Sequence, residues 1–358
     1  MNEKKILITG ASGFIGSTAV DKALELGFDT WAGIRKSSSR AYLQDERIRF
    51  IDLPYHDKEK LREQLHSFMD QHGRFDYILH IAGATQALRE ADFYRVNYEY
   101  TRHLVDVLIE EGLQPDAFVL MSTLGVLGVG DEVGYTPFRA DHVPNPNTAY
   151  GRSKLQAENY LKGLDNFPYL ILRPTGVYGP RDKDYLILMK AVKSGVNVGA
   201  GFKEQQLSFI YSEDLVDIIF MLLEKEVTRR EFLISDGDSY TDSEFNAIVQ
   251  EALQRKRVLR VKVPLWIVKP AALLSEKWAA LFGKTTTFNS DKYNIMKQRN
   301  WACDITPLRE AIDFTPAHKL KEGVTKTVAW YKEHGWLKTM GRMKKGKHVR
   351  VTQGGQVT

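Results

Sequence analysis

The stretch KILITGASGFIG, residues 5–16, decides the fold. It begins with a mostly apolar segment that predicts a buried strand, and it runs into a helix-period segment near 14–27. Between the two stand Gly10, Gly13 and Gly16, at a spacing that permits a tight turn, close approach of the backbone to a pyrophosphate, and close packing of helix on strand. The first N–H groups of the helix would face that pyrophosphate. Because a strand precedes and a helix follows, the segment predicts a dinucleotide site made of Gly10, Ser12, Gly13, Phe14, Ile15 and Gly16.

The same alternation continues through the first half of the chain. Short apolar segments at 30–34, 49–53, 77–81, 118–122 and 169–172 predict further buried strands, and helix-period stretches near 57–71, 91–111 and 148–164 separate them. Strands that are apolar on both faces and alternate with helices indicate a parallel sheet covered on both sides. The expected fold class is therefore α/β: a doubly wound parallel sheet of the Rossmann type with a smaller C-terminal lobe.

The domain organisation follows from where this regularity weakens. We expect a dinucleotide-binding domain at residues 1–178, to which segments at about 206–236 and 312–337 return. A substrate-binding lobe is expected at about 179–205 and 237–311. Residues 338–358 contain six Lys or Arg and no acidic residue, and we expect this basic tail to be disordered.

Composition excludes several classes of protein. With 43% hydrophobic and 27% charged residues among 358, the chain has a globular composition. The net charge of +5 comes from the tail, since the rest holds 44 basic and 45 acidic residues, so no nucleic-acid partner is expected. The single Cys303 offers no internal disulfide and no zinc quartet, and no metal site is expected. No signal-peptide core and no apolar run of ~18 residues is present, so we expect a cytoplasmic protein without a membrane partner.

The end of the second predicted strand bears on the choice of cofactor. An acidic residue there would bind the ribose 2′-hydroxyl and select NAD. The sequence instead reads IRKSSSR at 34–40, and the guanidinium of Arg35, with Lys36 beside it, suits a 2′-phosphate. NADP is therefore the predicted cofactor, with NAD as the alternative if this basic loop faces only solvent.

A second cluster of residues points to proton transfer. Tyr150 and Lys154 are spaced i, i+4 on a predicted helix, so the phenol and the ammonium share one face. A free tyrosine has a pKa of ~10, but a nearby ammonium and an oxidised nicotinamide would both favour the phenolate. Ser122 and Thr123 end the fifth predicted strand, at the sheet edge where ligands bind in such folds.

Together these residues resemble the NAD(P)-dependent epimerase/dehydratase family of the extended short-chain dehydrogenase/reductase superfamily. The resemblance covers Gly10 to about Leu337 and includes further matches, namely HIAG at 80–83, Asn97, RPTGVYGPR at 173–181 and FIYSEDL at 209–215. It implies reversible hydride transfer between nicotinamide C4 and a carbon that bears oxygen.

The resemblance also implies roles for single residues. Tyr150 would exchange the proton as general acid or base, and Lys154 would hold the nicotinamide ribose and tune Tyr150. Thr123, five residues before Gly128 as in the family pattern, would hydrogen-bond the reacting oxygen. Further contacts to the dinucleotide are implied for Asp52 and Leu53 at the adenine, for Pro174, Gly176 and Val177 at the nicotinamide, and for Ala82, Gly83 and Asn97. Members are commonly homodimers, here through the helices near 91–111 and 148–164.

The chain departs from the family pattern where substrates are recognised. Leu124 and Gly125 follow Thr123 in place of the Asp-Glu pair of a dehydratase, so dehydration is not expected. Leu207 stands where many nucleotide-sugar members carry an arginine, and residues 296–301 depart from their Arg-x-Gly-Asp-Pro-like stretch. A phosphate could still be contacted by Arg181, Lys203, Arg299 or the run Arg255-Lys256-Arg257. The alternative interpretation of each is an ordinary solvated surface charge.

Three functions stay open. The family favours a nucleotide-sugar epimerase or 4-keto reductase. The alternative is an NADPH-dependent reductase or dehydrogenase of a less polar carbonyl compound (hydroxysteroid-, aldehyde- or dihydroflavonol-like), for which the apolar stretch 265–282 would serve as a lid rather than as a packing helix. A non-catalytic NADP-sensing regulator is the third, and the presence of both Tyr150 and Lys154 speaks against it.

Overall fold

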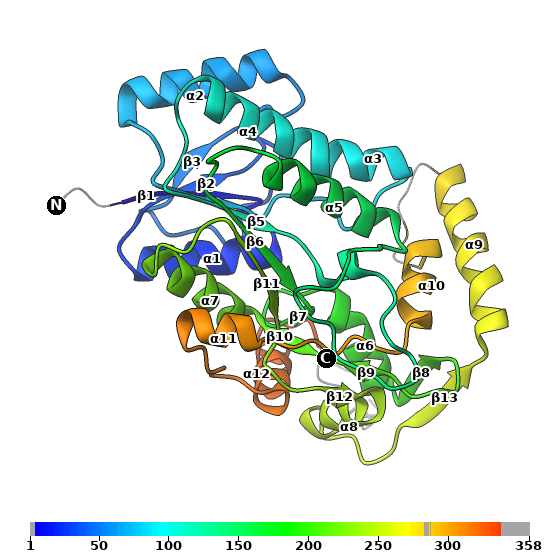
Figure 1. The fold of residues 1–358 in the computed structure, drawn as a ribbon. Helices are drawn as coiled ribbons and strands as arrows, with labels where there is room; N and C mark the ends of the chain where they lie inside the picture. The colour runs from blue at the N-terminus through cyan, green and yellow to red at the C-terminus, as the bar shows by residue number, and fades with distance from the viewer. Residues whose placement is uncertain (1–3, 283–285, 287, 338–358) are drawn as a thin grey trace, which may run out of the picture.

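A seven-stranded parallel sheet forms the centre of the computed structural model, which describes residues 4–282, 286 and 288–337 (Figure 1). Its strand order is β11-β6-β5-β4-β1-β2-β3. The strands are β1 (Lys5–Thr9), β2 (Asp29–Gly33), β3 (Arg49–Ile51), β4 (Tyr77–His80), β5 (Ala117–Met121), β6 (Tyr169–Pro174) and β11 (Arg230–Ile234). The chain therefore starts in the middle of the sheet and winds outward in both directions, as the doubly wound class predicts.

Helices cover both faces of this sheet, as Figure 1 shows. On one face lie α1 (Phe14–Glu25), α7 (Ser212–Glu224) and α11 (Thr306–Ile312), and on the other lie α2 (Lys58–His72), α4 (Tyr100–Glu110) and α5 (Ala149–Lys162). Every residue of β4, β5 and β6 is buried, which explains their continuous apolar sequences. The predicted fold class is confirmed, and the expected strands differ from the observed ones only by a residue or two at their ends.

The helix expected at 91–111 is divided into three parts. α3 (Glu90–Tyr94) runs into a single π-helical turn, η1 (Arg95–Glu99), and then into α4. The π turn carries Asn97, which is fully buried. Its amide donates to the Ala84 carbonyl at 3.0 Å and to Ser153 Oγ at 2.9 Å, while its oxygen accepts from Ala84 N–H at 2.8 Å. Asn97 thus fixes the loop after β4 to helix α5.

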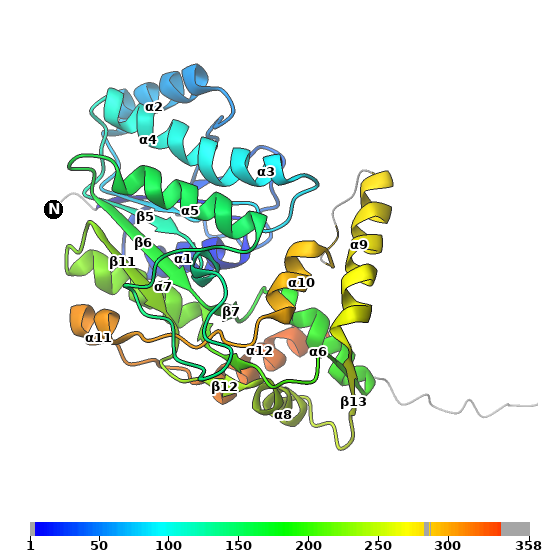
Figure 2. The ribbon, with the colours of Figure 1, turned by 45° about the vertical axis from the view of Figure 1, so that its right-hand side comes forward.

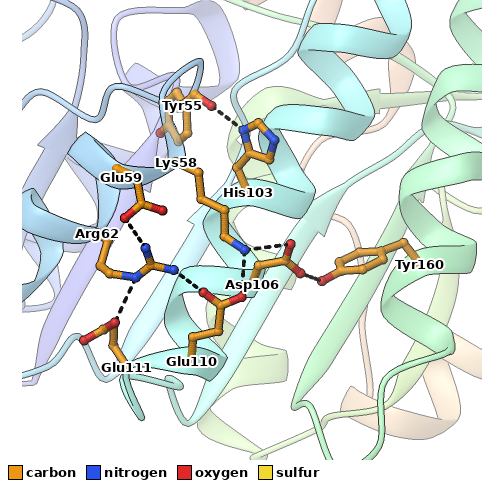
Figure 3. A network of polar contacts seen from close by, with 9 residues as sticks. All are labelled: Tyr55, Lys58, Glu59, Arg62, His103, Asp106, Glu110, Glu111 and Tyr160. Atoms are coloured by element: carbon orange, nitrogen blue, oxygen red, sulfur yellow. Dashed lines mark hydrogen bonds and ion pairs between the residues drawn. The ribbon is translucent and has the colours of Figure 1, made fainter.

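A network of charged side chains joins α2 to α4 and α5 (Figure 3). Lys58 Nζ lies 2.7 Å from Glu110 and 3.4 Å from Asp106, which also accepts from the Tyr160 hydroxyl. Arg62 extends the network to Glu59, Glu110 and Glu111. The face that α2, α4 and α5 share is therefore rich in charge. The homodimer expected through 91–111 and 148–164 stays a prediction.

The remaining elements form short ribbons and helices beside the sheet. The strand pairs are β7 (Gly176–Tyr178) with β10 (Phe209–Tyr211), β8 (Val196–Ala200) with β13 (Leu259–Val263), and β9 (Gln206–Leu207) with β12 (Tyr240–Thr241). The helices are the 3₁₀ turn η2 (Leu124–Leu127), α6 (Asp184–Ser194), α8 (Asp242–Ala252), α9 (Leu265–Leu281), α10 (Ser290–Lys297) and α12 (Leu320–Glu333). A third apolar cluster, around Tyr178, Phe209, Phe245 and Tyr331, holds α6, α8 and α12 together.

The expected domain boundaries stay predictions, and the basic tail 338–358 lies outside the described residues. No helix within residues 4–282, 286 and 288–337 is long and apolar enough to cross a membrane.

Candidate active site

The glycine turn after β1 is fixed by packing as well as by backbone conformation. Gly10 has a φ of +66°, and a Cβ there would lie 2.8 Å from Cα of Ala82. A Cβ on Gly16 would lie 2.2 Å from the carbonyl oxygen of Gly10. Gly13 N–H donates to that same carbonyl at 2.9 Å and closes the turn. Any side chain at Gly10 or Gly16 would therefore push helix α1 away from the ends of β1 and β4.

The first turn of α1 is suited to a phosphate group. Its N-cap is Gly13, and no side chain caps the helix. The N–H groups of a first helical turn have no partner within the helix, so those of Phe14 and Ile15 are available to an anion. The predicted residues thus fit the pyrophosphate of a dinucleotide.

The residues expected at the adenosine end lie at neighbouring strand ends. β2 and β3 are adjacent and parallel, with Gly33 opposite Ile51. Arg35 and Lys36 follow β2 and Asp52 follows β3, and all three are exposed, whereas Leu53 is buried. Arg35 makes no ion pair with any described residue. Its guanidinium is therefore available beside the place where an adenosine ribose would lie.

A cavity of about 250 Å³ brings four of the predicted site residues together, namely Thr123, Tyr150, Pro174 and Gly176. Tyr150 reaches it from the first turn of α5. Thr148 caps that turn, and its hydroxyl accepts from Gly151 N–H at 3.0 Å. Lys154 lies one turn further along α5 and is buried, with Nζ donating to the Met121 carbonyl at 2.9 Å. Asp291 of α10 accepts from the backbone N–H groups of Ala149 and Tyr150, at 3.1 and 3.2 Å.

Burial governs the protonation of Tyr150 and Lys154. It raises the pKa of Tyr150 to about 12. It also lowers the pKa of Lys154 to about 8, against the opposing charge of Glu158. The sequence suggested that the ammonium would favour the phenolate, whereas in this structure desolvation dominates. Tyr150 is therefore a neutral phenol near pH 7, able to donate a proton.

Thr123 and Ser122 have different surroundings. The Ser122 hydroxyl is buried and donates to Glu158 Oε1 at 2.5 Å. Thr123 lines the cavity, and its hydroxyl oxygen accepts from Gly125 N–H at 3.1 Å. Because that bond uses the oxygen and leaves the hydroxyl proton, Thr123 can donate to a ligand oxygen. This arrangement favours Thr123 over its neighbour as the residue that contacts substrate.

One part of the site has no counterpart in the predicted residues. Glu158, one turn after Lys154 on α5, binds Arg173 of β6 through two hydrogen bonds of 3.1 and 2.6 Å. Arg173 also lies 3.0 Å from Glu231 of β11. Both Glu158 and Arg173 are at most 1% exposed. An arginine in the otherwise apolar run YLILRP, 169–174, is the sequence signal for such a buried partner.

None of the residues proposed for a phosphate contact lines the cavity. Arg181 pairs with Asp21 at 2.8 Å, and Arg299 donates to the carbonyls of Ala200 and Lys203. The lining includes the apolar side chains of Leu207, Phe209, Phe245, Ile295 and Trp301. No residue of the whole lining carries a formal charge. Among the described residues, no group of three His, Cys, Asp or Glu side chains is placed to hold a metal ion.

Comparison with known proteins agrees with this geometry. Residues 6–235 match the model of the NAD dependent epimerase/dehydratase family. The chain is 29% identical over 337 residues to UDP-glucose 4-epimerase of Vibrio cholerae, covering 90% of this chain and 94% of that protein. It is 23% identical over 341 residues to ceramide reductase of Caulobacter vibrioides, covering 93% and 96%.

A solved structure shows the same fold. The crystal structure of UDP-glucose 4-epimerase from Thermotoga maritima with UDP-glucose superposes with a TM-score of 0.73 at 22% identity, covering 92% of this chain and 99% of that one. With the family model spanning most of the sheet and the cavity, the chain belongs to the NAD-dependent epimerase/dehydratase family of extended short-chain dehydrogenases/reductases.

Proposed function

We propose that this protein is an NAD(P)-dependent oxidoreductase that reduces a ketone to a secondary alcohol. The observation that carries this proposal is the shared cavity of Thr123 and Tyr150, beside Pro174 and Gly176 at the carboxyl end of the sheet. A nicotinamide cofactor, when bound, supplies the hydride that the carbonyl carbon accepts. Because Thr123 and Tyr150 line one cavity, an enzyme is favoured over a regulator that binds the cofactor without turnover.

The chain's own residues would handle the oxygen and its proton. Thr123 donates a hydrogen bond to the carbonyl oxygen and orients it. Tyr150 transfers its phenolic proton to that oxygen as the alcohol forms, and its raised pKa keeps the proton in place until then. The ammonium of Lys154 stabilises the phenolate that remains, and the pKa of Lys154, lowered by burial to about 8, leaves it mostly charged near pH 7.

The cavity supports a less polar carbonyl compound as the substrate. A diphosphate would need a cationic partner once it is removed from water, and the lining offers no charged side chain. Leu207 lines the cavity and stands at the position where many nucleotide-sugar members of the family carry an arginine. The likeness to ceramide reductase of Caulobacter vibrioides supports the same class.

A nucleotide-sugar epimerase or 4-keto reductase is the second candidate. The observation in its favour is the 29% identity to UDP-glucose 4-epimerase of Vibrio cholerae over nearly the whole chain. In that case the diphosphate would lie outside the described cavity, against exposed side chains such as Lys203.

These two candidates predict opposite results in a binding screen. With NADPH present, apolar ketones should raise the melting temperature and be reduced, and UDP-, GDP- and dTDP-sugars should do neither. Leu207→Arg should lower kcat/KM for the ketone by about tenfold or more, because it replaces an apolar contact by a charge. A larger thermal shift with a UDP-sugar than with any ketone would establish the second candidate in place of the first.

Arg35 allows a separate test of cofactor choice. NADP is proposed because the exposed guanidinium of Arg35 follows β2, where a ribose 2′-phosphate would lie. Arg35→Asp should shift the ratio of kcat/KM for NADPH and NADH toward NADH by at least about tenfold, since a charge-assisted bond is lost and a repulsion is added. Lys225→Asp makes the same change of charge at the exposed end of α7 and should leave the ratio unchanged. An unchanged ratio in Arg35→Asp would mean that the basic loop faces solvent.

A further inference from the structure

Helix α9 presents large apolar side chains to solvent along one side. Trp266, Trp278 and Leu281 are 76%, 64% and 79% exposed, and Leu273, Leu274 and Phe282 are exposed as well. At helical spacing these residues cover about half of the circumference of α9 and continue to Phe282 just beyond it, and we call this exposed half the α9 face. No described residue covers it, and in Figure 2 α9 stands at the outer edge of the molecule. An apolar face of this size on a surface helix is unusual and indicates a binding surface.

Positive charge lies on α9 and on the segment that leads into it. Residues 254–282 contain seven Lys or Arg and a single acidic residue, Glu276. Six of the cations are exposed and form no ion pair with a described residue, namely Lys256, Arg257, Arg260, Lys262, Lys269 and Lys277. Lys269 and Lys277 lie on α9 itself, at spacings that place them next to Trp266 and Leu273. Such lysines can extend their charge beyond the apolar side chains around them.

The opposite side of α9 packs toward α10, which forms part of the cavity wall. Val268 and Ala272 are buried. The carboxylate of Glu276 accepts from the backbone N–H and hydroxyl of Ser290, at 3.2 and 2.5 Å, so the only acid of this segment is turned inward. Ser290 begins α10, which supplies Ile295 to the cavity. As Figure 2 shows, α10 lies between α9 and the rest of the molecule, so the α9 face points away from the cavity and outward to solvent.

In contrast to the expectation from the sequence that the protein has no membrane partner, we propose that the α9 face docks on the surface of an anionic lipid bilayer. Tryptophan, phenylalanine and leucine on one helix face, flanked by lysine and arginine, are the chemistry of a helix that lies in the headgroup region. These cations complement anionic headgroups, and interfacial tryptophans favour the boundary between water and hydrocarbon. The helix lies on the bilayer and does not span it. Docking rests on this surface alone, independently of the reaction.

Vesicle binding tests the proposal with the full chain. The protein should co-sediment with vesicles of phosphatidylcholine and phosphatidylglycerol, and much less with vesicles of phosphatidylcholine alone. Leu274→Glu should weaken binding by about tenfold or more, because an apolar group that enters the headgroup region becomes a charge. The matched control is Leu26→Glu, at the exposed C-terminal end of α1, which should bind as the wild type does. Tyr150→Phe should also bind normally, which separates docking from catalysis.

Three outcomes would overturn the proposal. The first is the absence of binding to anionic vesicles. The second is binding that Leu274→Glu leaves intact and that removal of residues 338–358 abolishes, since the basic tail would then be the lipid-binding segment. The third is a concentration-dependent dimer, seen by analytical ultracentrifugation, that Leu274→Glu disrupts while no vesicle binding is found. In that case a second copy of the chain would cover the α9 face.

Discussion

Replacing Tyr150 with phenylalanine is expected to lower kcat by about 10²–10⁴-fold, the range for loss of a positioned general acid. The variant removes one hydroxyl and keeps the ring that packs near Phe93, so the cavity keeps its shape. The phenol of Tyr150, with its pKa raised by burial to about 12, is far more acidic than the Ser and Thr hydroxyls that line the cavity, and the only other phenol in that lining belongs to Tyr185. Steady-state reduction of a ketone with NADPH measures the effect.

The cavity also provides a matched control. Tyr185 lines the same cavity and, like Tyr150, is a partly buried phenol whose pKa is raised by desolvation. Tyr185→Phe makes the same chemical change without removing the proposed acid, and kcat should fall by much less. NADPH binding, followed by its fluorescence, should be nearly unchanged in Tyr150→Phe. Normal turnover in Tyr150→Phe, or a larger loss in Tyr185→Phe, would contradict the role assigned to Tyr150.

The parts of the molecule that were predicted correctly depend on local sequence. The glycine turn needs only its own three glycines and the ends of β1 and α1, and its spacing is readable within residues 5–16. The strands of the main sheet are short, and β4, β5 and β6 are buried on both faces, so their apolar runs give nearly their full extent. Tyr150 and Lys154 lie four residues apart on one helix, which fixes their relation without any tertiary information. Their roles in catalysis stay predictions until turnover is measured.

The features that were missed depend on tertiary packing. Desolvation raises the pKa of Tyr150, and that desolvation comes from residues that only folding brings around the phenol. Glu158, Arg173 and Glu231 come from α5, β6 and β11, whose order across the sheet is known only once the chain has folded. The apolar stretch 265–282 reads as a packing helix or a lid, and only the structure shows how much of α9 stays exposed.

Arg173→Met is expected to lower the free energy of unfolding by about 3–5 kcal/mol, the cost of leaving a buried charge unpaired. Arg173 supplies both hydrogen bonds that neutralise Glu158 and a third to Glu231. Glu158 is completely buried, and water cannot replace the guanidinium. Urea unfolding followed by circular dichroism measures the change. Arg74→Met, which breaks the exposed pair with Asp116, should cost at most about 1 kcal/mol.

The double variant Arg173→Met, Glu158→Leu separates an unpaired charge from lost packing. Removing both partners leaves neither charge of this pair unpaired, although the buried Lys154 loses the opposing charge of Glu158. Apolar replacements of similar size are often nearly neutral, so the double variant should be more stable than Arg173→Met alone. Recovery should be incomplete, because Ser122 loses the carboxylate that accepts its hydrogen bond at 2.5 Å. If the double variant were instead less stable than either single variant, the two residues would contribute through shape and not through charge.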